Sequence, residues 1–103
     1  MQPFVRSKMT ELLELCRMHS VKRLELFGSA ASADFRPETS DIDFIVEFLP
    51  IERGGLNDVY FDLLEDLERL FGRKVDLVEA SAIHNRFFRA SVEATKVPIY
   101  AAA

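Results

Sequence analysis

The amino-acid sequence predicts an α/β (α+β) domain in which helices pack on a small mixed β-sheet. Amphipathic stretches with helical spacing alternate with short stretches of alternating apolar and polar residues, which is typical of this class. The chain has 103 residues, of which 49% are apolar, so it can fold but has no room for a second core of useful size. We therefore expect residues 1–103 to form a single domain.

The first half of the chain is expected to contain one helix and two strands. A single apolar stripe predicts an amphipathic helix of roughly three turns that ends near His19. The stripe consists of Val5, Met9, Leu12, Leu13 and Cys16. Residues 21–27 alternate as a half-buried strand does, and Gly28-Ser29 ends that strand. After a short helical turn and a polar loop, residues 41–49 form the clearest strand of the sequence.

The second half alternates between helices and strands. A long apolar stripe predicts a helix that begins at Asn57, expected to be its N-cap, and stops at Gly72. Residues 74–79 form the next predicted strand, and Ser81 is expected to cap a third helix. The buried side of that helix is expected to be Ile83, Phe87, Phe88 and Val92. Residues 97–100 are expected to close the chain as an edge strand, which tolerates a proline.

Composition and charge argue against several classes of protein. The net charge is −4 and the pI is near 5.1, so generic binding to a nucleic-acid backbone is disfavoured. No apolar run approaches the ~18 residues of a membrane span, and charges interrupt the N-terminal stretch where a secretory signal would be apolar. The one cysteine, Cys16, cannot form an internal disulfide. We expect a cytoplasmic protein with no membrane contact.

Three aspartates are the main candidates for chemistry. Asp41 and Asp43 are two positions apart in a predicted strand, so their side chains project from the same face. Asp76 lies on another predicted strand, and if the two strands are neighbours, three carboxylates converge. Such a cluster is an all-oxygen site suited to Mg²⁺. Two ions held there would serve in-line displacement at phosphorus.

Gly28 and Ser29 form the complementary half of the predicted site. A glycine allows close approach of the backbone to a ligand, and the Ser29 hydroxyl and nearby amides can donate hydrogen bonds to phosphate oxygens. A Gly-Ser pair alone is a weak signal. Followed by Asp-x-Asp entering the next strand and a lone aspartate on a third strand, it is a strong one.

These motifs resemble a known family. Residues 26–31, followed by Arg36-Pro37 and residues 40–46, resemble the signature of the polymerase β-type nucleotidyltransferase superfamily, and within it the minimal nucleotidyltransferase (MNT) domains. Residues 72–78 and 97–100 are similar to the usual end of an MNT domain. The resemblance implies a polymerase β-like nucleotidyltransferase fold over nearly the whole chain.

The resemblance also implies an activity and a partner. Many MNT proteins are antitoxins of HEPN–MNT toxin–antitoxin pairs, and members of that group transfer AMP from ATP to a tyrosine of the HEPN ribonuclease toxin. By this resemblance, Gly28 and Ser29 would hold the triphosphate of ATP, and Asp41 and Asp43 would bind two Mg²⁺ ions. Asp76 would complete the catalytic metal site and help to activate the incoming hydroxyl.

The chain departs from the family pattern at two places, and alternatives stay open. The family often carries Arg-Gly where this chain has Ser32-Ala33, and the loop at Glu38-Thr39-Ser40 is one residue longer than the commonest form. One alternative is a non-catalytic antitoxin that neutralises the toxin by binding alone. Another is a nucleotidyltransferase that acts on a small molecule or an RNA end.

Other polar residues have ordinary structural interpretations. Glu47 is expected to be solvated or paired with a cation, Cys16 to be a small core residue, and His19 to lie favourably at the end of a helix. His84 is expected to lie on the surface in the first turn of the last helix. The outer side of that helix, around Arg86, is expected to be solvated, with a toxin-facing patch as the alternative.

Overall fold

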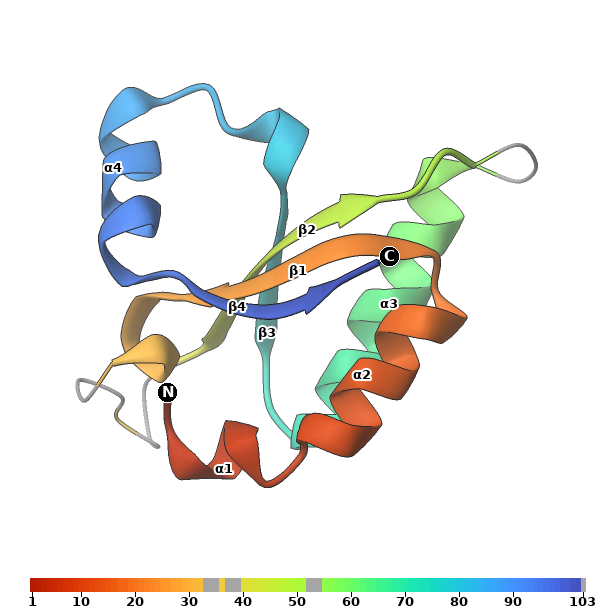
Figure 1. Cartoon of the computed structure of the whole chain (residues 1–103), viewed down its shortest axis with the longest axis horizontal. Helices are drawn as coiled ribbons and strands as arrows, with labels where there is room; N and C mark the ends of the chain where they lie inside the picture. Colours follow the sequence, from red (N-terminus) through yellow and green to blue (C-terminus); the bar gives the residue numbers. More distant parts are fainter. Residues whose placement is uncertain (33–35, 37–39, 52–54, 103) are drawn as a thin grey trace.

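A computed structural model describes residues 1–32, 36, 40–51 and 55–102 of the chain. Four strands form one mixed sheet in the order β3-β2-β1-β4 (Figure 1). The elements are α1 (Pro3–Arg6), α2 (Met9–Met18), β1 (Val21–Phe27), the 3-10 turn η1 (Gly28–Ala31), β2 (Ile42–Phe48), α3 (Leu56–Phe71), β3 (Val75–Glu79), the 3-10 turn η2 (Ala80–Ala82), α4 (Arg86–Thr95) and β4 (Val97–Ala101). This arrangement confirms the predicted fold class.

The pairing of the strands follows from their connections. β1 pairs antiparallel with β2 and with β4, whereas β2 pairs parallel with β3. A parallel pair needs a crossover connection, and α3 supplies it. Figure 1 shows α2 and α3 side by side, while α4 lies apart from them towards the other end of the sheet. The strand that ends the chain, β4, is an edge strand, as its proline predicts.

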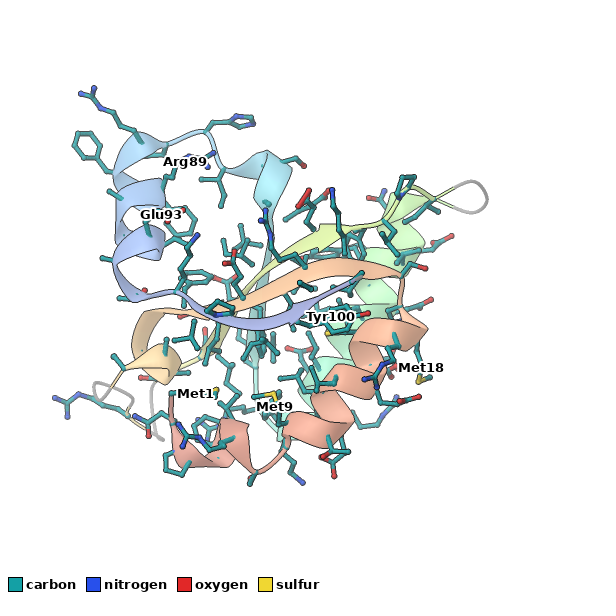
Figure 2. All side chains as sticks on the ribbon, in the orientation of Figure 1. Met1, Met9, Met18, Arg89, Glu93 and Tyr100 are labelled. Carbon is teal, nitrogen blue, oxygen red and sulfur yellow. The ribbon has the colours of Figure 1, made fainter. Side chains whose placement is uncertain are left out.

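The main core lies between the sheet and the first three helices. Phe44 of β2 is fully buried there and its ring lies 6.1 Å from that of Phe71 at the end of α3. Other fully buried side chains are Val5, Leu12, Cys16, Val21, Leu24, Leu26, Ile42, Val46, Leu63 and Leu67. Met9 packs against this core, whereas Met18 at the end of α2 is exposed (Figure 2). Alternate residues of β1 and β2 thus face the helices, as the alternation predicts.

A second, smaller core occupies the opposite face of the sheet. It consists of Phe27, Ile45, Ile83 and Val92, with Val78 and Ala80 packed against it. The ring of Phe88 meets Phe27 edge to face at 5.7 Å. This cluster attaches η2 and α4 to the sheet and brings the end of α4 towards the end of β1.

The N-terminal segment differs from the single predicted helix. It forms two helices, because Lys8 donates its N–H to Val5 O and the tighter turn interrupts the regular pattern. The break lets both Val5 and Leu12 reach the core. Of the predicted apolar stripe, Val5, Leu12 and Cys16 are buried as expected, whereas Leu15 packs against the core in place of Leu13. The prediction of one continuous helix was wrong.

Both predicted helix N-caps are wrong. α3 begins at Leu56 after Gly55, so Asn57 lies inside the helix. Ser81 lies in η2, and Asn85 caps α4 by accepting hydrogen bonds from the backbone N–H groups of Phe87 and Phe88. The predicted stop at Gly72 is confirmed, because this glycine adopts a left-handed conformation with φ 63°.

The later start of α4 changes which side chains are buried. Ile83 precedes the helix and is buried, and Val92 is buried as predicted. Phe87 is 74% exposed and Phe88 is 37% exposed, so both were wrongly assigned to the buried side. His84 is exposed, as predicted, but it precedes the helix instead of lying in its first turn. Among the described residues, no helix is long and apolar enough to cross a membrane.

Candidate active site

The sheet brings three of the predicted site residues into one row. Phe27 at the end of β1 is paired with Asp43 of β2, and Asp43 is paired with Asp76 of β3. Gly28 directly follows Phe27. Asp43 and Asp76 therefore lie side by side on neighbouring strands, on the face of the sheet that also carries Ile45, and Gly28, the first residue of η1, lies against Asp43.

The pKa of Asp43 is raised by its position in this row. Partial burial, with the negative charges of Asp76 and Asp41 nearby, raises the pKa of Asp43 from its usual 3.8 to about 6. Burial is the largest cause, and the two neighbouring carboxylates add to it. A cation between these carboxylates would remove the repulsion, so the row favours binding of a positive ion.

Gly28 meets Asp43 at very close range. Its φ of 70° is left-handed, and a Cβ atom at this position would collide with Asp43 Oδ2 and lie 3.3 Å from Asp43 Cγ. A side chain is thus excluded both by conformation and by the carboxylate. The backbone N–H of Gly28 donates to Thr95 Oγ1 at 3.0 Å. Gly28 therefore matters at this site because it has no side chain. Its backbone N–H is already hydrogen-bonded to Thr95.

The turn after Gly28 contains Ser29 and continues as one short 3-10 turn. The backbone N–H and the hydroxyl of Ser32 donate to Ser29 O at 3.2 and 3.3 Å. Gln2 contacts the same turn through its backbone N–H, which donates to Ala30 O at 3.0 Å. Ser29 is half-buried at the end of β1, next to the row of carboxylates. Its hydroxyl is suited to donate to a phosphate oxygen.

Asp41 lies one residue before β2, outside the strand on which it was predicted. Its Oδ2 lies 3.9 Å from Lys74 Nζ, and both side chains are well exposed. Ahead of it, Arg36 and Ser40 bond to each other: Arg36 N–H donates to Ser40 Oγ at 3.0 Å, and Ser40 N–H donates to Arg36 O at 2.8 Å. These bonds join Arg36 to Ser40, the residue directly before Asp41. Ala33, Glu38 and Thr39, where the chain departs from the family pattern, lie outside the described residues.

The carboxylates fit a hard divalent ion by their chemistry and strand positions. Within the described part of the chain, no three His, Cys, Asp or Glu side chains stand close enough together to hold a metal ion as they are. The donors are nevertheless all oxygen, and two of them belong to paired positions on adjacent strands. Asp41, Asp43 and Asp76 are therefore the candidate ligands for Mg²⁺.

The polar residues with ordinary interpretations behave largely as predicted. Glu47 shares the face of Asp43 but pairs with Arg23 at 3.1 Å and with Lys22 at 3.8 Å. Cys16 is buried in the main core. His19 lies at the end of α2 and its Nε2 lies 2.7 Å from an Asp66 carboxylate oxygen, a contact between helices that the sequence did not indicate. Thr95 and Gln2 were likewise missed, because nothing in their local sequence marks them.

Comparison with known proteins identifies the family. The family model of the nucleotidyltransferase domain matches residues 9–99. This chain belongs to that family. Two relatives of this nucleotidyltransferase in Methanocaldococcus jannaschii are each named "Putative protein adenylyltransferase". One is 37% identical over 93 residues and the other 34% identical over 94, and both alignments cover 82% of this chain and 91% of the relative.

Solved structures support the same assignment at the level of the fold. A "putative minimal nucleotidyltransferase" superposes on this nucleotidyltransferase with a TM-score of 0.72 and 32% identity, covering 91% of each chain. A complex of tri-AMPylated Shewanella oneidensis HEPN toxin with MNT antitoxin gives a TM-score of 0.65 at 18% identity, covering 94% of this chain and 72% of that one. A toxin–antitoxin structure with AMP-PNP gives 0.70 at 20% identity, covering 91% of this chain and 73% of that chain. The sheet with its helices is the minimal nucleotidyltransferase fold.

Proposed function

We propose that this nucleotidyltransferase is a protein adenylyltransferase that transfers AMP from ATP to a tyrosine of a cognate HEPN ribonuclease toxin, and thereby acts as the antitoxin of the pair. The observation that carries the proposal is the row formed by Gly28 just after β1, Asp43 of β2 and Asp76 of β3. The names of the M. jannaschii relatives favour AMP as the transferred group and a protein as the acceptor. The resemblance to HEPN–MNT antitoxins favours the toxin as that protein.

Each site residue has a defined task in this proposal. The Ser29 hydroxyl, on a turn that begins with a side-chain-free Gly28, would donate to the triphosphate of ATP. Asp41, Asp43 and Asp76 would hold two Mg²⁺ ions. When bound, Mg²⁺ polarises phosphoryl oxygens and neutralises the charge that develops on the leaving group.

In the proposed reaction, ATP and the acceptor hydroxyl give the AMP ester, pyrophosphate and one proton. The acceptor hydroxyl oxygen forms a bond to the α-phosphorus of ATP, the bond between that phosphorus and the oxygen bridging to the β-phosphorus breaks, and pyrophosphate leaves with the electron pair. In this proposal Asp76 would accept the hydroxyl proton. Because Asp76 is exposed on the edge strand β3, it can pass that proton on to water. The same exposure lets a hydroxyl on the surface of another protein approach.

The test is transfer of AMP between purified proteins. The chain is incubated with ATP, Mg²⁺ and the protein encoded beside its gene, and each protein is weighed by intact-mass spectrometry. We expect the partner to gain the mass of one or more AMP units, and peptide mapping to place them on tyrosine. Asp43→Asn removes a carboxylate of the row and should abolish the gain.

Glu47→Gln is the matched control variant. Glu47 lies on the same strand and the same face as Asp43 but pairs with Arg23, so its variant should keep full transfer. A stable complex that blocks the partner without any mass gain would contradict the proposal and favour an antitoxin that acts by binding alone. Pyrophosphate release that needs a small-molecule acceptor and no partner protein would favour the other alternative.

A further inference from the structure

We infer that Thr95 is a positioning residue for nucleotide binding, because its hydroxyl holds the turn that begins at Gly28 in place beside Asp43. This inference rests on the proposed function, since it concerns how the same site is kept ready for ATP. Thr95 is the last residue of α4 and is 67 residues away from Gly28 in the sequence. The contact exists only through the tertiary structure.

The Thr95 hydroxyl both accepts and donates a hydrogen bond with the backbone around it. It accepts the hydrogen bond from Gly28 N–H at 3.0 Å and donates its own hydrogen to Ser91 O at 3.2 Å. With both roles occupied, the hydroxyl has one favoured orientation. The Gly28 amide therefore has a fixed acceptor, and the left-handed glycine keeps the conformation that brings it against Asp43.

The end of α4 is itself anchored, so it can serve as a support. Lys96 follows Thr95, and its Nζ lies 3.6 Å from Glu25 Oε2 on β1 and 3.0 Å from Glu93 Oε2 on α4. Glu25 is buried, and Val92 packs in the small core on this face of the sheet. Figure 2 shows Glu93 on α4 above the sheet. The acceptor of the Gly28 amide is thus tied to the strand that carries Gly28.

The N-terminal segment holds the same turn from its other end. Gln2 donates its backbone N–H to Ala30 O at 3.0 Å and its side-chain amide to Ser32 O at 2.6 Å. Thr95 and Gln2 together restrain both ends of the turn. A binding site whose donors are already ordered loses less entropy when the ligand binds.

The experiment compares three forms of the full chain. Thr95→Val keeps the shape of the side chain but removes the hydroxyl, and Thr95→Ser keeps the hydroxyl. Isothermal titration with ATP and Mg²⁺ gives the dissociation constant, and hydrogen exchange by NMR follows the Gly28 amide without ligand. We expect Thr95→Val to weaken ATP binding about 3- to 10-fold and to speed exchange at Gly28, while Thr95→Ser stays within about 2-fold of the wild type.

Thr10→Val, an exposed threonine in α2, is the control for replacing threonine by valine in a helix. Failure of the wild type to bind ATP would overturn the proposed function, and the role of Thr95 with it. Equal ATP binding by the wild type and Thr95→Val would overturn the role of Thr95 alone. If Thr95→Val does not fold, Thr95→Ala takes its place with the same expected results, and an unprotected Gly28 amide in the wild type refutes the inference.

Discussion

Gly28 and Asp43 are in such close contact that residue 28 has no room for a side chain. The Cβ of any other residue would collide with Asp43 Oδ2, and the backbone of Gly28 is left-handed as well. The glycine of the Gly-Ser pair therefore serves two purposes at once. It ends β1, and its lack of a side chain leaves room for the carboxylate of Asp43.

Replacement of Gly28 by alanine tests this contact directly. We expect Gly28→Ala to abolish AMP transfer and ATP binding, because the new methyl group displaces Asp43. Gly72→Ala is a matched control, since Gly72 has a similar φ of 63° and no atom within 4 Å of a Cβ built there. Backbone strain should cost each variant about 1 kcal/mol in urea unfolding, and Gly28→Ala should lose more because its methyl group also collides with Asp43. Full transfer by Gly28→Ala would show that the contact is not needed.

The stability of the metal-free protein should depend on the protonation of Asp43. Its pKa is higher in the folded chain, about 6, than the usual 3.8, so the stabilisation from its proton is fully present below pH 3.8 and is lost as the pH rises through about 6. A shift of this size corresponds to ~3 kcal/mol, of which solvent screening at a half-buried carboxylate leaves ~1 kcal/mol. In the presence of a chelator, the Asp43→Asn variant should therefore have a higher midpoint urea concentration for unfolding than the wild type above pH 6. Near pH 3.8 the two midpoints should be nearly equal. A variant that is less stable than the wild type above pH 6 would contradict this account.

Addition of Mg²⁺ and ATP should stabilise the wild type by mass action, because ligands that bind only the folded state raise the melting temperature. Asp43→Asn and Asp76→Asn should lose most of this increase, since each removes a carboxylate from the row. Asp62→Asn on the exposed side of α3 should keep it. Differential scanning fluorimetry with and without chelator measures the effect. An equal increase in all four proteins would place the binding of metal and nucleotide elsewhere.

Mutation can show whether Asn85 or Ser81 caps α4. Asn85→Ala removes the acceptor for two backbone N–H groups and should lower the free energy of unfolding by about 1 kcal/mol. Ser81→Ala should change it by only a few tenths, because the exposed Ser81 hydroxyl contacts only Glu79. Urea unfolding of the two variants gives the comparison. The reverse order of effects would restore the cap predicted from the sequence.

Cys16 should be inert in the native protein. Burial in the main core raises the pKa of its thiol to about 12, with Arg17 opposing the shift, so almost no thiolate is present at neutral pH. We expect negligible labelling by a thiol reagent under native conditions and full labelling in urea, followed by absorbance or intact mass. Rapid native labelling would mean that α2 separates readily from the sheet.

Several elements could be predicted because their signals are local. The alternation in residues 21–27 and 41–49 indicates strands whose apolar faces are buried, and Phe44 and Leu24 are indeed buried. Gly72 marks the end of α3 because few other residues adopt its conformation without strain. The wrong N-caps have the opposite cause. Several polar residues near a helix start can act as caps, and packing of Ile83 and Val92 on the sheet decides where α4 begins.

The candidate site residues could be named from local sequence patterns: two aspartates two positions apart at the start of one strand, a third on a later strand, and a Gly-Ser pair at the end of an earlier one. That these strands are neighbours, in the register that places Asp76 opposite Asp43 and Gly28 against it, follows from the tertiary structure. The tertiary structure also decided that Thr95 and Gln2, from opposite ends of the chain, hold the glycine turn. The physical reason is that side-chain direction follows from local periodicity, whereas strand order and long-range hydrogen bonds depend on how the helices and strands pack together.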